Sequence, residues 1–454
     1  MIEAIGIITR DRPGEAAALA HALAQEERAR GRRLPVLVAD DSRDGAMNEA
    51  LAREIAALDD PLVRVVGAAE RARVGEHLIA HGCDPESVEF AIGDLFGLDV
   101  TPGANRNFVR LLTGGRSIAV LDDDVRPRGL RPPDFSDVVS ASRTLDPNES
   151  WFFDDRDAFV NADWVDLDIV GELDRALVLP RGSAPPLALA GMGLAGDIGS
   201  ANAVVLLAAN PSSRARLMDP RRYEFVRRSR IVLRTVRCPI IGDGGPWNPA
   251  ASAYAAEPVL PPFFPVLRGQ GPLFGATIRC GRAWSTVRLP WALQHRVVPD
   301  DDTAFDRIVA TTARPGAATF IHMLVATSAV DRAAADETLV EVGRRLMTTG
   351  ELPFESFKDV LAARMRSRQE SLLKSLRQLI VRYGRTPEAW AADVDGTIAK
   401  LAAARADPTP LVPHDLDRHE HPFALMRELV RSLGRLYAAW PQMMAAARSL
   451  PWPP

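Results

Sequence analysis

Cysteine is scarce in this chain of 454 residues. The three cysteines, Cys83, Cys238 and Cys280, are odd in number and far apart. Disulfide frameworks and zinc sites need several cysteines or histidines at short, regular intervals, so the sequence predicts neither. We expect buried free thiols in a reducing compartment.

A surplus of basic charge is also absent. Lys and Arg number 55 against 59 Asp and Glu, so the formal net charge is −4. Proteins that bind nucleic acid usually carry a basic surplus, and we expect no such partner here. The arginines between residues 221 and 230 fit a solvated face as well as an anion-binding patch.

Long hydrophobic runs are missing too. The longest, near residues 185–195 and 203–209, fall short of the roughly 18 residues of a membrane-spanning helix. Met1 leads into a short strand-like run and then into charged residues, unlike a signal peptide. These features predict a cytoplasmic protein with no membrane span.

The first 125 residues alternate strand and helix patterns. Apolar runs predict strands at residues 4–8, 35–39, 63–66 and 117–121, and helix formers predict helices at 15–30 and 45–58. Strands separated by helices indicate βαβ units and a mainly parallel sheet. Ligands bind such sheets at the carboxyl ends of the strands. Three of these ends are polar: Thr9-Arg10, Asp40-Asp41 and Asp122-Asp123-Asp124.

The rest of the chain has two different characters. Residues 126–299 are rich in Pro and Gly, which predicts irregular binding loops or an inert surface insertion. Beyond about residue 329 strand patterns vanish, and apolar spacing near 3.6 predicts helices at 333–348, 354–383, 387–405 and 423–447. We expect a helical domain over residues 329–454 that packs on itself or joins two copies into a homo-oligomer.

The strongest chemical pattern is the acidic end of the fourth predicted strand. In extended chain, side chains at i and i+2 point to the same side, so Asp122 and Asp124 share a side. Mg²⁺ and Mn²⁺ favour such oxygen ligands and leave positions open for phosphate oxygens. An acidic turn without a metal is the alternative, because such turns are common after strands.

The order of these motifs resembles the nucleotide-sugar-binding half of GT-A fold glycosyltransferases, nearest to family 2. The shared features are the three polar strand ends and the run Gly-Ala-Asn-Arg-Asn at residues 103–107. The resemblance covers residues 1–126 and weakens up to about residue 300. It implies an α/β, GT-A (Rossmann-like) domain over residues 1–328, with a nucleotide-sugar half (1–126) and an acceptor half (127–328).

The resemblance implies roles in a nucleotide pocket. Thr9 and Arg10 would line it, and Asp40 or Asp41 would bind the base or ribose. Asn105 would lie beside the nucleotide.

The resemblance also implies a metal site for Mn²⁺ or Mg²⁺. Arg106 would contact the diphosphate or pair with an aspartate. Asp122 would face ribose or sugar hydroxyls or join the metal, and Asp124 would ligate the metal. The resemblance does not decide which of the three aspartates ligates the metal, so Asp123 stays a candidate. His295, in Trp-Ala-Leu-Gln-His at residues 291–295, is the best-placed further ligand; a structural histidine is the alternative.

The chain departs from family 2 at the catalytic base. The region that should carry a Glu-Asp pair, residues 265–275, has Gln270 instead of an acid. Asp197 and Asp243 are the replacement candidates, and each is equally a turn aspartate. Inversion and retention both stay open. The Gln-x-x-Arg-Trp motif of processive membrane synthases is absent.

Two further motifs are interpreted as coincidences. Residues 191–196 match G-x-G-x-x-G, but no helix start or acidic strand end follows at the required spacing. Residues 393–397 match the Asp-x-Asp-Gly-Thr of haloacid dehalogenase-like phosphatases, but a helical pattern precedes them.

The sequence therefore predicts a metal-dependent glycosyltransferase that uses a UDP- or GDP-linked sugar. The acceptor, a small molecule, peptide or glycan, stays undetermined. Aromatic residues in the acceptor half would stack on a sugar or pack in the core: Trp247, Tyr254, Phe263, Phe264 and Trp284. The alternatives are a sugar-phosphate nucleotidyltransferase and a degenerate scaffold that binds a protein partner.

Overall fold

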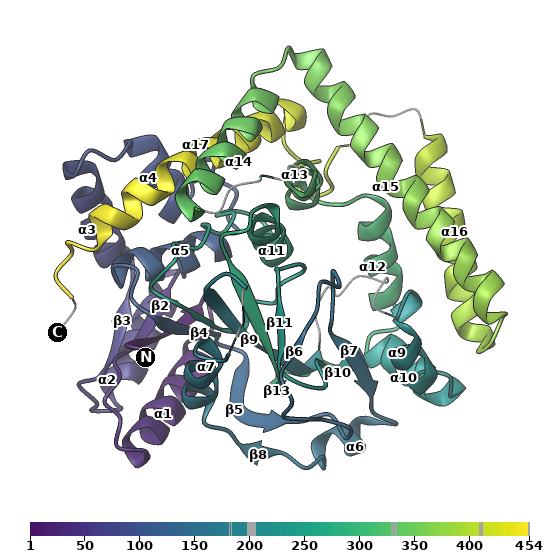
Figure 1. Cartoon of the computed structure of the whole chain (residues 1–454), viewed down its shortest axis with the longest axis horizontal. Coiled ribbons are helices and arrows are strands. Elements are labelled where there is room, and N and C mark those ends of the chain that lie inside the picture. Colours follow the sequence, from purple (N-terminus) through teal and green to yellow (C-terminus); the bar gives the residue numbers. More distant parts are fainter. Residues whose placement is uncertain are drawn as a thin grey trace.

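A mixed β-sheet runs through the molecule, and helices cover both of its faces (Figure 1). The computed structural model describes residues 1–180, 182, 184–197, 206–327, 330, 334–407 and 412–452. The sheet has the strand order β3-β2-β1-β4-β12-β9-β13-β11-β6, with further strands paired off this path. The chain is thus an α/β protein, as predicted.

The N-terminal part of the sheet is parallel. It consists of β1 (Ala4–Thr9), β2 (Val36–Asp40), β3 (Val63–Val66) and β4 (Ile118–Asp122), which confirms the four predicted strands. β1 pairs with β2 on one side and with β4 on the other. The chain adds β2 and β3 on one side of β1 and then places β4 on the other side. The position between β1 and β4 is therefore a topological switch point, and parallel sheets bind ligands at such points.

Alternation along β1 explains the two helical layers. Ile5 and Ile7 are buried in a core shared with α1 (Pro13–Ala29) and α2 (Gly45–Ala56). Ala4 and Ile8 point the other way, into a core with α3 (Ala68–Ala80), α4 (Pro85–Ile92) and α5 (Pro102–Leu112). Side chains alternate faces with period two in a strand, so one short apolar run supports both layers.

The prediction that residues 126–299 are mainly irregular was wrong. This region contains two strands of 11 residues, β9 (Leu187–Asp197) and β13 (Ser285–His295), which are parallel neighbours in the sheet. Both strands are buried on both faces, like β1 and β2. They differ from these in composition: β9 has three glycines and no β-branched residue, and β13 contains Pro290, and such residues weaken the strand pattern. Two further strands complete the neighbourhood of the site: β5 (Val125–Leu130) and β12 (Ala251–Tyr254).

The other elements of the middle region are shorter. The strands are β6 (Ser140–Ala141), β7 (Glu149–Phe152), β8 (Val165–Asp166), β10 (Ile231–Thr235) and β11 (Ile240–Gly242). The helices are α6 (Arg156–Val160), α7 (Ile169–Leu177), α9 (Pro211–Arg216), α10 (Pro220–Ser229), α11 (Gln270–Cys280), α12 (Ala304–Ala313) and α13 (Ala317–Ala326).

The glycine-rich motif at residues 191–196 lies inside the strand β9, so the motif residues themselves are not part of a helix. A β-carbon on Gly191 would collide with the Trp247 indole, and one on Gly193 with the backbone oxygen of Arg234. Gly196 has φ +141° and packs against the backbone of His295. The motif therefore serves close packing of neighbours on β9, which agrees with its interpretation as a coincidence.

The C-terminal helices agree with the predicted ranges. They are α14 (Ala335–Gly350), α15 (Phe354–Tyr383), α16 (Glu388–Ala406) and α17 (Pro422–Ala447). The Asp-x-Asp-Gly-Thr motif is helical, as expected, and Asp393 pairs with Arg227 of α10 at 2.7 Å. No helix of the described residues is long and apolar enough to cross a membrane.

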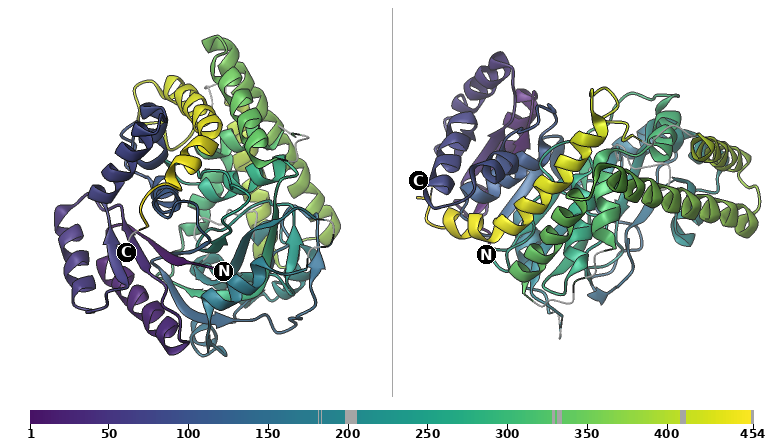
Figure 2. Two further views of the ribbon diagram at one scale, coloured as in Figure 1. Left: turned by 60° about the vertical axis from the view of Figure 1, so that its left-hand side comes forward. Right: turned by 90° about the horizontal axis from the view of Figure 1, so that it is seen from above.

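These helices divide into two pairs. α14 and α17 cross where Gly343 meets Gly434, and Tyr437 and Trp440 enter the same core as α4, α5 and α11. α15 and α16 form a separate pair on the side of the molecule away from α1–α3 (Figure 2). The C-terminal segment thus shares its core with the α/β part, and assembly of two copies through it stays a prediction.

Candidate functional site

A cleft of about 1440 Å³ opens where β1, β4 and β13 end. All the predicted site residues except Asp40 and Asp243 line it: Thr9, Arg10, Asp41, Asn105, Arg106, Asp122, Asp123, Asp124, Asp197, Gln270 and His295. Residues at the ends of the parallel strands β1, β2 and β4 form one wall of the cleft, and residues of β9, β13 and α11 form the other. The cleft therefore brings together residues from both halves of the predicted GT-A domain.

The three aspartates after β4 have different partners. Asp122 accepts a hydrogen bond from Arg106 of α5. Asp123 accepts from the Thr9 hydroxyl at 2.7 Å and from Arg12 at 3.0 Å. Asp124 accepts from Arg12 at 2.9 Å and contacts His295. Each carboxylate is thus held by a cation or a hydroxyl in the cleft wall.

These environments shift the pKa values in opposite directions. Burial raises the pKa of Asp122, and it raises the pKa of Asp123 to about 6. Burial acts in the same direction on Asp124, but the bonds and charges of His295 and Arg12 outweigh it and lower its pKa. Asp124 is therefore the aspartate most strongly held in its charged form, the form that ligates a cation.

The contact between His295 and Asp124 depends on the pairing of β13 with β5. His295 lies opposite Val125 in that ladder, and the next amide, of Arg296, donates to the Asp124 carbonyl at 2.9 Å. The His295 Nε2 then lies 3.2 Å from Oδ1 of Asp124. Burial lowers the pKa of His295, but the neighbouring carboxylate of Asp124 raises it above the ordinary value.

The residues present fit a metal ion in part. Within the described ranges, no group of three or more His, Cys, Asp or Glu side chains converges to hold one. Adjacent ligands of an octahedral ion lie about 3.0 Å apart, given bonds of about 2.1 Å, and Asp124 and His295 meet this spacing. The protein thus offers two ligands once Nε2 of His295 has lost the proton that it shares with Asp124, and a bound diphosphate would have to supply the rest.

Asp41 lies at the end of the cleft formed by β2 and α5. Arg71 of α3 donates to its Oδ1 at 3.3 Å and to Asn105 Oδ1 at 3.2 Å, and Thr101 donates to its other oxygen. Asn105 in turn donates to the carbonyl of Ala39 at 2.8 Å. This network fixes a carboxylate at the cleft wall and includes Arg71 and Thr101, which the sequence did not single out.

Asp40 has a different position. It is 4% exposed, and its carboxylate accepts from Ser42 and from Asn48 at 2.7 Å. These bonds close the loop between β2 and α2. Of the two aspartates predicted to bind the nucleoside, only Asp41 faces the cleft.

The candidate bases are also separated by the structure. Asp197 lines the cleft at the end of β9 and pairs with Arg230 at 2.7 Å. Asp243 lies outside the cleft and pairs with Arg279 at 3.1 Å. Gln270 lines the cleft at the start of α11. Of the five aromatics predicted to stack on a sugar or fill the core, Trp247 lines the cleft, and all five are buried.

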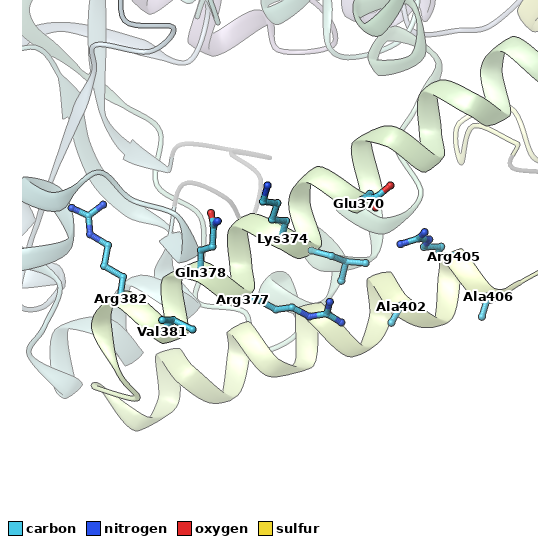
Figure 3. Close-up of a pocket in the computed structure, with 10 residues that line it drawn as sticks. Glu370, Lys374, Arg377, Gln378, Val381, Arg382, Ala402, Arg405 and Ala406 are labelled. Carbon is cyan, nitrogen blue, oxygen red and sulfur yellow. The ribbon is translucent and has the colours of Figure 1, made fainter.

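A second hollow of about 810 Å³ lies between α15 and α16 (Figure 3). Arg377 and Arg405 lie between the two helices, with Lys374 and Arg382 nearby and Glu370 as the one acidic lining residue. None of its lining residues belongs to the sheet. The chemistry of the three aspartates is therefore confined to the first cleft.

Comparison with known proteins does not assign a family. No protein-family model matches the chain, and no curated protein matches its sequence.

Proposed function

We propose that this protein is a metal-dependent glycosyltransferase of the GT-A type that takes a nucleotide-diphosphate sugar, UDP- or GDP-linked, as its donor. The observation that carries the proposal is the contact between Asp124 and His295 in a cleft at the switch point between β1 and β4. This arrangement supports a metal at the diphosphate, with the nucleoside toward Asp41 and Asn105.

The proposed donor site uses each residue for a separate task. Asp124 and His295 would hold Mn²⁺ or Mg²⁺, and this ion would stabilise the charge of the departing diphosphate. Asp41, held by Arg71 and Thr101, would accept hydrogen bonds from the base or ribose. Arg106 holds Asp122 in the cleft wall, where that carboxylate would face sugar hydroxyls.

The reaction proposed for this site is a substitution at the anomeric carbon. An acceptor oxygen forms a bond to that carbon, and the bond from the carbon to the diphosphate oxygen breaks. The diphosphate leaves with the electron pair, and the acceptor proton passes to a base. Asp197 is the candidate base that lines the cleft, where it forms an ion pair with Arg230.

Calorimetric titration of the protein with UDP- and GDP-linked sugars, with and without Mn²⁺, tests the proposal. We expect one nucleotide sugar to bind, and its affinity to depend on the metal. Absence of binding by every nucleotide sugar in the presence of Mn²⁺ would instead favour a degenerate scaffold.

A further inference from the structure

We propose that the same cleft contains a separate oxyanion subsite at Arg288, and that it binds a carboxylate or phosphate group of the acceptor. The assignment of this anion to an acceptor rests on the proposed function. The anion site itself is argued from the buried arginine and its surroundings alone.

Arg288 is a cation inside the sheet. It lies on β13 opposite Gly191 of β9, is 8% exposed, and lines the cleft. Burial lowers its pKa to about 10, which leaves it charged at neutral pH. A buried charge is costly unless a partner compensates it.

The protein supplies only part of that compensation. Nη2 of Arg288 donates to the carbonyl of Pro246 at 2.6 Å, and the guanidinium lies 4.9 Å from the centre of the Trp247 ring. Among the described residues, no carboxylate lies within ion-pair distance of Arg288, and its Nε and Nη1 make no hydrogen bond. Two donors of a planar, charged fork are thus left for a ligand, and such a fork matches the geometry of a carboxylate or phosphate.

The surroundings support the same ligand class. Arg234 of β10 also lines the cleft. The charge of Asp146 raises the pKa of Arg288, and the repulsion from Arg234 lowers it by a smaller amount. Arg234 is held by Asp146 and donates to the Ser150 hydroxyl at 3.2 Å. Two arginines against one aspartate leave a positive balance at this end, and Ser150 and Asn148 add polar groups to the wall.

The glycines of β9 explain how the subsite is built. Because Gly191 has no β-carbon, the Trp247 indole can lie directly on β9, where its Nε1 donates to Ser252 at 3.0 Å. Trp247 is 4% exposed and forms the floor under Arg288. The arginine is therefore fixed on a rigid aromatic surface before any ligand arrives, which reduces the entropy cost of binding.

The subsite is distinct from the aspartate site. Arg288 and His295 are seven positions apart on β13. Arg288 lies opposite Gly191 of β9 and Gln294 lies opposite Ala195, and these two residues of β9 are about 13 Å apart in extended chain. A donor diphosphate at Asp124 and an anion at Arg288 can therefore occupy the cleft together. The occupant that suits this position is an acceptor with a negative charge remote from its reacting hydroxyl.

The anion site is tested without metal or nucleotide. Sodium phosphate and sodium acetate are titrated separately into the wild type, Arg288→Gln and the control Arg53→Gln, with ionic strength held constant by sodium chloride. Arg53 is 72% exposed on α2, outside the cleft. We expect calorimetry to show binding of at least one anion, a loss of affinity of about tenfold or more in Arg288→Gln, and no change in Arg53→Gln. The anion that binds distinguishes a phosphate group from a carboxylate.

Arg288→Lys is a second variant that distinguishes loss of the site from a folding defect, since lysine keeps the positive charge and lacks the planar guanidinium group. We expect it to fold and to bind the anion more weakly than the wild type. No binding of either anion by the wild type, or equal affinity in Arg288→Gln, would overturn the proposal and leave Arg288 as a packing residue for Pro246 and Trp247.

The acceptor assignment is tested next, with glucose, glucuronate and glucose 6-phosphate as acceptors for the nucleotide sugar that binds. We expect a lower KM for a charged acceptor than for glucose, and Arg288→Gln to remove this difference. Anion binding without such a preference would refute the acceptor assignment alone. Failure of every nucleotide sugar to bind would refute the proposed function and leave the anion site standing.

Discussion

The Nε2 atom of His295 lies 3.2 Å from the Oδ1 atom of Asp124, and this contact joins the end of β13 to the end of β4. We predict that His295→Ala weakens Mn²⁺ binding in the presence of UDP by about tenfold or more, because it removes one of two side-chain ligands. The control is His421→Ala, whose side chain is 76% exposed. Unchanged metal affinity in His295→Ala would remove this histidine from the site.

Asp40 at the end of β2 and Asp41 directly after it should respond differently to substitution. Asp41→Asn should raise the KM for the donor, and Asp40→Asn should leave that KM unchanged, since only Asp41 faces the cleft. Asp40→Asn should lower the free energy of unfolding by about 1–3 kcal/mol, because it disturbs the buried bonds to Ser42 and Asn48. Urea denaturation and steady-state kinetics of both variants check this division. Equal effects on KM would contradict the separation of the two roles.

The close approach of β9 and β10 predicts a steric effect. A β-carbon on Gly193 would collide with the backbone oxygen of Arg234, so Gly193→Ala should lower the free energy of unfolding by about 1–3 kcal/mol or more. Gly396 of α16 has no such neighbour, and Gly396→Ala should raise stability by about 0.5–1 kcal/mol. Urea denaturation of the two variants measures the contrast. A stable Gly193→Ala protein would show that β9 and β10 are not packed as described.

A histidine outside the cleft predicts a pH dependence of stability. Burial on α13, with a smaller contribution from the charge of Arg368 on α15, lowers the pKa of His322. The unfolded chain, with a His pKa of about 6.5, then binds more protons than the folded protein between the two pKa values. The contribution of His322 to stability is present above about pH 6.5 and is lost as pH falls through the folded pKa.

Unfolding free energies at pH 7.5 and at pH 5 check this sign. The wild type should lose more stability over this interval than His322→Gln, which has no proton to bind. Equal losses in the two proteins would exclude His322 as the cause.

The N-terminal sheet was predictable from sequence because its signals are local. The runs that form β1 to β4 are short, apolar and bounded by helix formers, so pattern and structure agree. The strands β9 and β13 gave a weaker signal, because β9 has three glycines and no β-branched residue and β13 is interrupted by Arg288 and Pro290. Their partners are also distant in sequence. Their pairing decides the shape of the cleft, and that shape could not be predicted.

The residues of the site were also predictable from sequence only in part. The three aspartates were recognisable from their place after a buried strand, and Asp124 and His295 do meet. Arg71 was not recognisable, because it shares α3 with the exposed Arg73 and only tertiary packing directs it to Asp41. Arg288 carried one overlooked signal, a single charge between Val287 and Leu289 in an apolar run. A lone arginine in a strand-like segment indicates a buried cation and therefore a partner or ligand.

The role of Asp124 is the central claim, and one activity measurement tests it most directly. Hydrolysis or transfer of the bound nucleotide sugar is measured with and without Mn²⁺ in the wild type, Asp124→Ala and Asp395→Ala. Asp395 is a 45% exposed aspartate on α16 that serves as the control. We predict metal-dependent turnover in the wild type and in Asp395→Ala, and none in Asp124→Ala. Metal-dependent turnover that persists in Asp124→Ala would contradict the proposed donor site.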